Sequence, residues 1–263
     1  MPRPGSSDNR RTPAGPAARV APGLLRTVQM RGIVAPVADP SSPFLDALLP
    51  VPGRKLAAHA NAVTCVLAGR TGPLRLDCDG RRIDGDILLV RPGVVHAVAL
   101  AERGADVLYL NGLAFPFDAP LAQVLGGVLA HLASDALRGD RCAMHELRAR
   151  LTAPAPRLPT GIAEAVRVIY ADPMQRMSQG ELARRLGMER TRALRCFKAA
   201  TGQTFRELKR WSALQHAAQL MAEGALVRTA AMDAGFADTA HLSRVFRRGF
   251  GLTPSAAIAG LGQ

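Results

Sequence analysis

The sequence predicts an α+β protein of two domains, a small β-barrel with flanking helices followed by an all-helical domain. Between residues 54 and 111, short runs of Val, Ile and Leu alternate with Gly, Pro and Asp, which is the pattern of strands joined by turns. Beyond residue 160, apolar residues recur at helical spacing instead. The segment 152–161 between them contains three prolines and is typical of a semi-rigid linker.

The composition is that of a globular protein with a strong positive charge. Of the 263 residues, 48% are hydrophobic and 21% are charged, which excludes a disordered or fibrous chain. The formal net charge of +13 predicts attraction to a polyanion such as nucleic acid, with an acidic substrate or a membrane surface as alternatives. The longest uncharged apolar-rich stretch, 119–134, is shorter than the roughly 20 residues of a membrane-spanning helix. We expect a soluble, cytoplasmic protein.

The positive charge is concentrated in two parts of the chain. Residues 1–31 hold six arginines against one acidic residue, with too little apolar surface for a core, and are predicted to be a disordered basic arm. Residues 160–263 hold 15 basic and 8 acidic residues, whereas residues 32–159 hold 13 and 12. The helical half is therefore the part expected to meet a polyanion.

The first half is predicted to contain short strands and then two helices. In the stretch 74–78, Leu74, Leu76 and Cys78 alternate with charged residues, as in a strand with one wet face, and Asp79-Gly80 is a hairpin-turn sequence. The predicted strands are 62–67, 74–78, 87–90, 94–100 and 106–110.

From Asp118 onward the apolar spacing becomes that of a helix. Its stripe consists of Leu121, Val124, Leu125, Val128, Leu129 and Leu132. A second short helix is predicted at 142–151. Such a stripe packs either on its own domain or against a second copy of the chain, and both remain open.

The second half contains an internal repeat with an offset of about 48 residues. Leu186 and Gly187 recur as Ala234 and Gly235, and Phe197 recurs as Phe246. Each copy has a helix, a glycine turn and a second helix, which is a helix-turn-helix. A connecting helix over 204–221, about 27 Å long, is expected to hold the two units about one DNA turn apart.

Helix-capping residues agree with these boundaries. Ser178 precedes Glu181 and Thr204 precedes Glu207 by three residues, the spacing of capping boxes, and Asp238 is placed to cap the last long helix. The second helix of each unit is expected to bury its apolar side and to present small and basic residues to the major groove. The candidate DNA-binding residues are Thr191, Arg192, Arg195, Lys198, Thr239, Ala240, His241, Ser243, Arg244, Arg247 and Arg248.

The stretch 234–254 resembles the AraC/XylS family of bacterial transcription regulators. The family pattern is present at Gly235, Phe236, Asp238, Arg244, Phe246, Gly251 and Pro254. The resemblance extends over about 173–258 and implies a regulator that binds promoter DNA, with RNA polymerase as a further partner and a homodimer as an expected assembly. It also implies a sensor domain at 32–151, a linker at 152–161 and a DNA-binding domain at 162–263.

Five residues depart from the family pattern, among them Leu242, which stands where an aromatic residue is usual. Ala213 stands where an arginine is usual, Ala230 where isoleucine is usual, and Glu189 where a small N-cap residue is usual. Leu194 stands where relatives often have a polar base reader. Leu194 either contacts a thymine methyl group, or it reads no base and the first unit binds mainly phosphates. For most of this family, we expect the second unit to be the one that binds phosphates.

The segment 85–96, with His59 upstream, resembles the cupin-like barrel that often precedes this DNA-binding domain and senses a small molecule. The resemblance implies effector binding by His59 and His96, although a structural role is equally open for each. A metal-binding cupin supplies further His and Glu ligands that are absent here, so we expect no metal and no cofactor.

Other function classes receive less support from the sequence. A DNA-repair methyltransferase of similar architecture needs four clustered cysteines, whereas Cys65, Cys78, Cys142 and Cys196 are widely spaced. A cupin-type enzyme needs a nucleophile, a carboxylate pair or a phosphate loop, and none is recognisable. A redox-sensing regulator that uses Cys65 and Cys78 remains an alternative. The sequence therefore favours a non-enzymatic transcription regulator with an unidentified effector.

Overall fold

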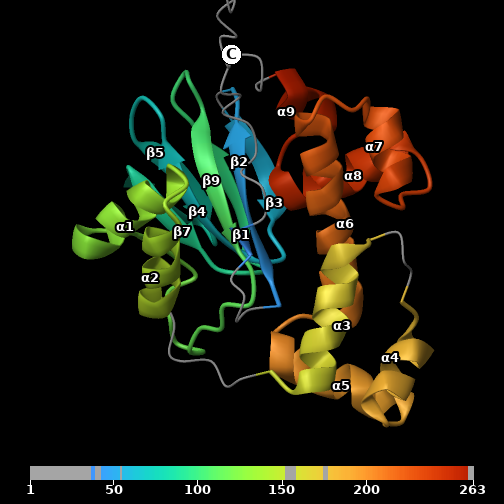
Figure 1. Cartoon of the computed structure of the whole chain (residues 1–263). Coiled ribbons are helices and arrows are strands. Elements are labelled where there is room, and N and C mark those ends of the chain that lie inside the picture. Colours follow the sequence, from blue (N-terminus) through green and yellow to red (C-terminus); the bar gives the residue numbers. More distant parts are fainter. Residues whose placement is uncertain (1–36, 39–42, 54, 152–157, 174–176, 260–263) are drawn as a thin grey trace, which may run out of the picture. The chain divides into compact units, whose positions relative to one another are not determined.

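The computed structural model describes residues 37–38, 43–53, 55–151, 158–173 and 177–259. The predicted arm at 1–31 and most of the predicted linker lie outside these ranges. Within them, the strands β1 to β10 come first and the helices α1 to α9 follow (Figure 1). The predicted division into a β-rich half and an all-helical half is confirmed.

The strands form two antiparallel sheets. The six-stranded sheet has the order β1 (Val37–Ala38), β2 (Leu45–Val51), β9 (Ala105–Leu110), β4 (Thr64–Gly69), β7 (Ile87–Val90) and β10 (Ala122–Val124). The four-stranded sheet has the order β3 (Lys55–Ala60), β8 (Val95–Ala99), β5 (Leu74–Cys78) and β6 (Arg81–Gly85). The inward residues of both sheets, among them Leu67, Leu76 and Val98, share one core.

The hairpin predicted at Asp79-Gly80 joins β5 to β6. Asp79 has φ 50° and Gly80 has φ 69°, so both central residues adopt the left-handed conformation that a tight two-residue hairpin turn requires. Leu74, Leu76 and Cys78 are buried while the residues between them are exposed. The alternation in the sequence therefore identified this strand and its turn.

The helix predicted from Asp118 was wrong over its first part. Residues 122–124 form β10, which pairs with β7, and α1 extends from Gly127 to Leu137. Pairing of β10 satisfies the backbone groups at the edge of β7, which the apolar spacing alone did not reveal. The buried residues of α1 are Ala133, Ala136 and Leu137. Of the predicted stripe, Leu129 and Leu132 pack half-buried against the same core, whereas Leu121, Val124 and Val128 are exposed.

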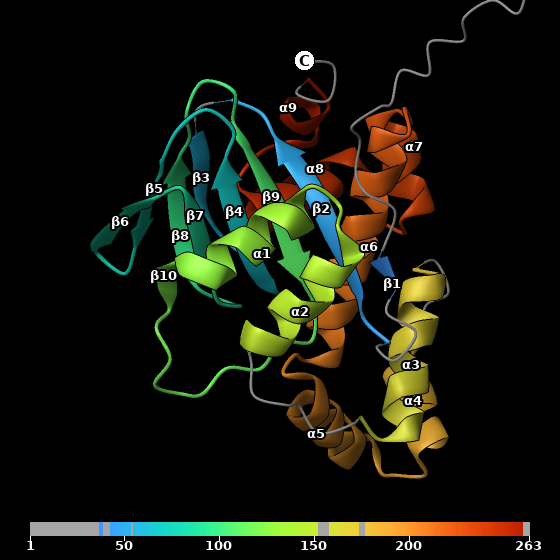
Figure 2. The same ribbon diagram turned by 60° about the vertical axis from the view of Figure 1, so that its left-hand side comes forward.

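The helices α1 and α2 (Arg141–Leu151) cover one face of the six-stranded sheet (Figure 2). They pack with Val66, Leu89 and Leu108 from β4, β7 and β9. Because these three residues alternate with the inward-facing ones, both faces of the sheet are apolar. The second helix predicted at 142–151 is confirmed as α2.

The second half contains α3 to α9. Their bounds are α3 Thr160–Ala171, α4 Gln179–Leu186, α5 Arg190–Thr201, α6 Phe205–Ala222, α7 Val227–Asp233, α8 Thr239–Phe250 and α9 Pro254–Ala259. Thr204 and Glu207 form the predicted capping box at the start of α6. Ser178 caps α4 through the backbone N–H of Glu181, but the Glu181 carboxylate binds Arg185, so only half of that capping box forms.

Two separate cores support the helical half. The first unit packs α3, α4, α5 and the start of α6 around Phe197, Leu182 and Leu208. The second unit packs α7, α8 and α9 on the later part of α6, and its core is continuous with the interior of the β-sheets. The second unit is therefore joined to the sheets by shared apolar packing.

Candidate nucleic-acid interface

The first helix-turn-helix unit consists of α4 and α5. Gly187 ends α4 with φ 61°, the left-handed conformation that closes the helix and turns the chain. Ala193 and Phe197 of α5 are fully buried, and the Phe197 ring meets Phe205 of α6 edge-on at 5.4 Å between centroids. This packing fixes which side of α5 faces outward.

The outward side of α5 carries the predicted residues. Thr191, Arg192, Arg195 and Lys198 are all exposed. Glu189 is the N-cap of α5, and its Oε2 accepts from the backbone N–H groups of Thr191 at 2.7 Å and Arg192 at 3.1 Å. These two bonds lower the pKa of Glu189. Glu189 thus caps α5 although a small residue is usual at this position. Its carboxylate also places a negative charge at the start of the helix.

The second unit consists of α7 and α8 and has the same construction. Its turn residue, Gly235, has φ 79°. Leu242 and Phe246 are fully buried, and Asp238 caps α8 by accepting from the His241 backbone N–H at 2.6 Å. The repeat therefore reproduces in space the pattern that it has in sequence.

The free side of α8 is exposed along its length. Thr239, Ala240, Arg244, Arg247 and Arg248 are exposed, whereas His241 and Ser243 are half-buried. The His241 ring lies edge-on to Phe236 at 5.4 Å between centroids. That packing explains the partial burial of His241 and leaves the arginines as the most accessible members of the predicted set.

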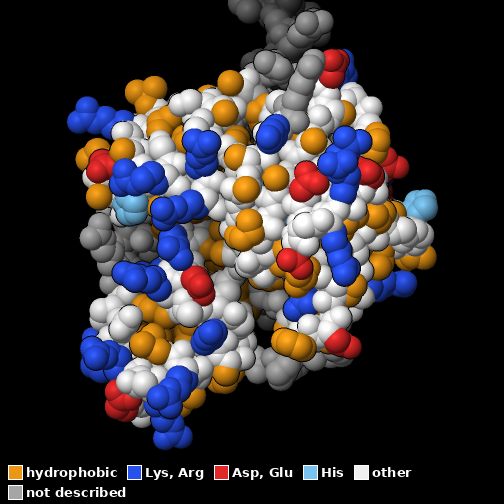
Figure 3. All heavy atoms as spheres, turned by 180° about the vertical axis from the view of Figure 1, so that it is seen from behind, with side chains coloured by type: hydrophobic (Ala, Val, Ile, Leu, Met, Phe, Trp, Pro, Cys, Tyr) orange, Lys and Arg blue, Asp and Glu red, His pale blue; other side chains and the backbone are white. Residues whose placement is uncertain are grey.

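The connecting helix α6 has 18 residues, as predicted, and Thr204 is its N-cap residue. Its side chains hold α3 and the segment before α4: Ser212 Oγ donates to Ile169 O at 2.9 Å and Lys209 Nζ donates to Met177 O at 2.7 Å. Figure 3 shows Lys and Arg side chains spread along the side of the molecule that the helical half occupies, at the left of the view. The basic residues thus extend over both units.

His59 and His96 lie opposite each other on β3 and β8 and are buried. Their ring centroids are 4.3 Å apart, and each Nδ1 donates to the carbonyl two residues earlier, Ala57 O at 2.8 Å and Val94 O at 2.9 Å. Both Nε2 atoms are buried without a hydrogen-bond partner. Burial, followed by the charge of His96, lowers the pKa of His59 to about 4, and burial also lowers the pKa of His96.

A small apolar cavity lies where β2 and β9 meet α6 and α8. Its volume is about 20 Å³, and Tyr109, Gln215 and Phe250 are among the residues that line it. This is space for about one water molecule, whereas small-molecule pockets measure about 300–1,000 Å³. The histidine pair is not part of its lining.

The cysteines and other potential metal ligands are dispersed. Cys65 and Cys78 are buried on β4 and β5, and burial raises the pKa of both thiols. Cys142 and Cys196 lie on α2 and α5 and are also free thiols. Among the described residues, no three His, Cys, Asp or Glu side chains gather in a way that could hold a metal ion. In the same residues, no helix is both long and apolar enough to cross a membrane.

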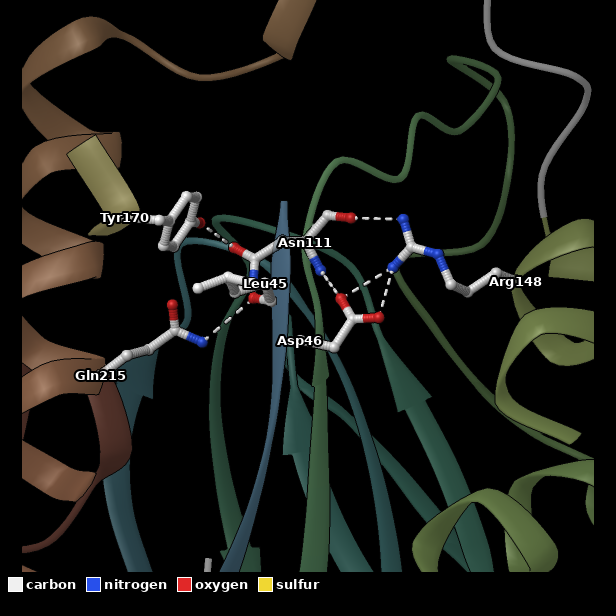
Figure 4. A network of polar contacts seen from close by, with 6 residues as sticks. All are labelled: Leu45, Asp46, Asn111, Arg148, Tyr170 and Gln215. Carbon is white, nitrogen blue, oxygen red and sulfur yellow. Dashed lines mark hydrogen bonds and ion pairs between the residues drawn. The ribbon is translucent and has the colours of Figure 1, made fainter. Parts of the chain in front are cut away.

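Sequence reasoning missed a polar network that includes contacts between the two halves. In Figure 4, Asn111, which follows β9, donates through its backbone N–H to Asp46, and its Oδ1 accepts from Tyr170 Oη of α3 at 2.7 Å. Arg148 of α2 donates to both Asp46 carboxylate oxygens at 2.8 Å. Gln215 of α6 donates to Leu45 O at 3.5 Å. These partners are 59 to 170 residues apart, and no spacing rule connects them.

Comparison with known proteins bears on the helical half first. Residues 182–259 match the family model described as a helix-turn-helix domain. The HTH-type transcriptional regulator RipA of Corynebacterium glutamicum is 36% identical over 110 residues. The matched part is 41% of this chain but only 31% of RipA.

Solved structures of ToxT from Vibrio cholerae resemble nearly the whole chain. One has a TM-score of 0.55 at 12% identity and covers 83% of this chain and 98% of its own. A second, with (E)-4-(8-methylnaphthalen-1-yl)but-3-enoic acid bound, has a TM-score of 0.54 at 12% identity and covers 82% and 98%. At this identity the likeness shows the fold alone. The C-terminal region of the chain is thus a helix-turn-helix domain of the AraC type, and it follows an antiparallel sheet domain as in the ToxT fold.

Proposed function

We propose that this protein is a sequence-specific DNA-binding transcription regulator of the AraC type that responds to a small-molecule effector. The observation that carries the proposal is the pair of helix-turn-helix units, each with an exposed basic side on its second helix. The alternatives, a cupin-type enzyme and a redox-sensing regulator, lack a comparable constellation among the described residues.

Each unit inserts its second helix into the major groove of duplex DNA. The residues proposed to contact DNA are Thr191, Arg192, Arg195, Lys198, Thr239, Ala240, His241, Ser243, Arg244, Arg247 and Arg248. Since arginine pairs bidentately with guanine or binds a phosphate, Arg195 and Arg244 are the residues whose loss is most informative. RNA polymerase is the further partner that a promoter-bound regulator of this class would contact.

The effector is proposed to bind in the sheet domain, near His59 and His96. Two buried Nε2 atoms without partners are acceptors that a ligand with donor groups would satisfy. The two histidines are buried and do not line the cavity of about 20 Å³, so a ligand can reach their Nε2 atoms only if the elements that bury them separate locally. The ToxT structure with a bound small molecule lends support to ligand binding by a protein of this fold.

The full-length chain is also proposed to form a homodimer. Phe117, Leu121, Val124 and Val128, just before and within α1, are large apolar side chains that remain exposed. An apolar surface of this kind favours association with a second copy. Sedimentation of the wild type and of Val128→Glu tests this: a dimer that dissociates in the variant supports the proposal, and a monomeric wild type contradicts it.

The DNA-binding proposal is tested by titrating the full-length protein with its own upstream DNA and with a scrambled duplex across a salt series. We expect tighter binding to the upstream DNA and a steep loss of affinity with salt. Arg244→Ala is expected to cost about 1–3 kcal/mol if Arg244 reads a base. The matched control is Arg82→Ala, which removes an exposed arginine on β6. Equal and weak binding to both duplexes would refute the proposal.

A further inference from the structure

The C-terminal end of α8 rests directly on β3 of the sheet domain (Figure 1). Ala57 donates its backbone N–H to Gly251 O at 2.9 Å, and Asn61 Nδ2 donates to Gly249 O at 2.5 Å. The last carbonyl groups of a helix have no partner within the helix. Two such groups of the second DNA-reading helix are therefore satisfied by the sheet domain.

An irregularity in β3 makes the first of these bonds available. The pairing of β3 with β8 shifts between Leu56, which is opposite Val98, and His59, which is opposite His96. Two residues of β3 thus face one residue of β8, which is a β-bulge. The backbone N–H of Ala57 lies in this bulge and bonds to α8 instead of continuing the ladder.

Gly251 fits this position for two reasons. Its φ of 75° is left-handed, which favours glycine at the end of a helix. A Cβ atom there would also lie 2.6 Å from His59 Nδ1 and 2.8 Å from Ala57 O. Contact with the sheet domain therefore excludes a side chain independently of the backbone conformation.

An aromatic cluster and a further hydrogen bond extend the contact between the sheet domain and the helical half. The rings of Tyr109, Trp211 and Phe250 meet pairwise at 5.3–5.4 Å between centroids. Gln203, in the turn before α6, donates its side-chain amide to Ala62 O. Arg244 and its exposed neighbours on α8 stay uncovered. The contact thus holds the second unit in place without covering its DNA-facing side.

We infer that Asn61 and the β3 bulge position α8 for DNA binding, so that the sheet domain acts on the second helix-turn-helix unit through the C-terminal end of its reading helix. The inference rests on the proposed DNA-binding function. It also gives His59 a route to DNA binding, since the His59 ring fills the space that a Cβ of Gly251 would need, and a ligand that displaces His59 would disturb the packing against the end of α8. A helix that is already oriented loses less entropy on binding.

The test uses the full-length protein and three duplexes: the intact upstream site and two versions in which either half is scrambled. The half contacted by α8 is the one whose scrambling abolishes the effect of Arg244→Ala. We expect Asn61→Ala to weaken binding roughly 5- to 10-fold on the intact site and on the duplex that keeps only the α8 half, which is the effect of one lost hydrogen bond. Binding to the duplex that keeps only the α5 half should not change.

Gln219→Ala is the matched control, because its amide lies on α6 and binds the exposed Glu223 instead of the sheet domain. It should bind all three duplexes like the wild type. Asn61→Asp is the second variant: it keeps the side-chain shape but replaces the donor with an acceptor facing Gly249 O, and it should show the same half-site pattern. Thermal unfolding of each variant identifies any that fails to fold.

The inference would be overturned if Asn61→Ala lost the same affinity for both half-site duplexes, or lost affinity for neither. It would also be overturned if Asn61→Ala bound DNA more tightly than the wild type. Wild-type behaviour of a folded Asn61→Asp would also overturn it. Failure of the proposed function is a separate outcome, since it appears in the wild type as equal binding to upstream and scrambled DNA before any variant is compared.

Discussion

His59 and His96 are stabilised in their neutral forms by their surroundings. Each Nδ1 must carry the proton, because a carbonyl oxygen only accepts. Protonation of either Nε2 would place a charge in a buried site beside a second imidazole 4.3 Å away. The opposite residue on β5, Cys78, has a pKa raised by burial and offers no compensating negative charge.

This arrangement predicts a loss of stability in mild acid. The pKa of His59 is about 4 in the folded protein and 6.5 ordinarily, so the unfolded chain binds a proton that the folded chain does not. The stabilisation is present above pH 6.5 and is lost as the pH falls toward 4. Linkage gives a loss of about 2 kcal/mol between pH 7 and pH 5.

Urea unfolding of the wild type and of His59→Asn at both pH values measures this loss. Asparagine keeps a donor near Ala57 O but does not titrate, so the variant should show a pH dependence smaller by about this amount. An identical pH dependence in the two proteins would contradict the prediction.

Hydrogen bonds stabilise the negative charge of Glu189 at the start of a proposed DNA-reading helix. Glu189→Ser keeps a good N-cap and removes a negative charge from the side that faces DNA. We expect the variant to bind any duplex more tightly at low salt, with the difference shrinking as salt rises. Glu181→Gln, which removes one charge from α4, is the control for a general charge effect. An unchanged affinity of Glu189→Ser would indicate that this end of α5 does not approach DNA.

At the scale of elements, the buried ion pair between Asp46 and Arg148 fastens α2 to β2. Asp46 is 6% and Arg148 16% exposed in their side chains, and Arg148 also donates to Asn111 O at 2.8 Å. Replacing Arg148 removes two charge-assisted hydrogen bonds from the buried Asp46 carboxylate. Arg148→Ala should therefore lower the free energy of unfolding by about 3–5 kcal/mol.

Arg150→Ala provides the comparison for this prediction. Arg150 pairs with Glu146 one turn away on the same helix, and both side chains are about half exposed. Surface pairs of this kind contribute about 0.3–0.5 kcal/mol. Similar values for the two variants in urea unfolding would show that the Asp46–Arg148 pair does not fasten α2 to the sheet.

The sequence predicted elements well where local patterns determine them. The repeat, the capping residues Thr204 and Asp238, and the Asp79-Gly80 hairpin were readable because each depends on neighbours along the chain. β10 was misassigned to a helix, since its pairing with β7 joins residues more than 30 positions apart. β3 was not predicted, because its bulge interrupts the alternation that marks a strand.

At the scale of the whole molecule, tryptophan fluorescence can report on the seam, which is the shared core between the sheets and the second helix-turn-helix unit. Trp211 is the only tryptophan of the chain, and it is 2% exposed between Tyr109 and Phe250. Because one core spans the seam, we expect unfolding followed by Trp211 fluorescence to coincide with unfolding followed by far-UV circular dichroism. A fluorescence change at lower denaturant concentration would show that the seam opens before the domains unfold.

The seam is also the part of the site that the sequence did not predict. The proline-rich segment 152–161 predicts two domains joined by a linker, and nothing in the composition indicates that they share a core. Asn61 and Gly249 are 188 residues apart, and each looks unremarkable in its local context. The exposed basic side chains, in contrast, follow from helical spacing alone.

The close fit of Gly251 against His59 also limits how this chain can be re-engineered. A chimeric biosensor that joins residues 1–159 to a foreign DNA-binding domain would bring a different helix end to the β3 bulge, and any side chain at that position would collide with the histidine. A transplant that respects the fit has to carry Trp211, Phe250 and Gly251 together with the sheets, and to exchange only the outward residues of α5 and α8. Re-targeting to a new promoter is then a matter of surface substitution instead of domain replacement.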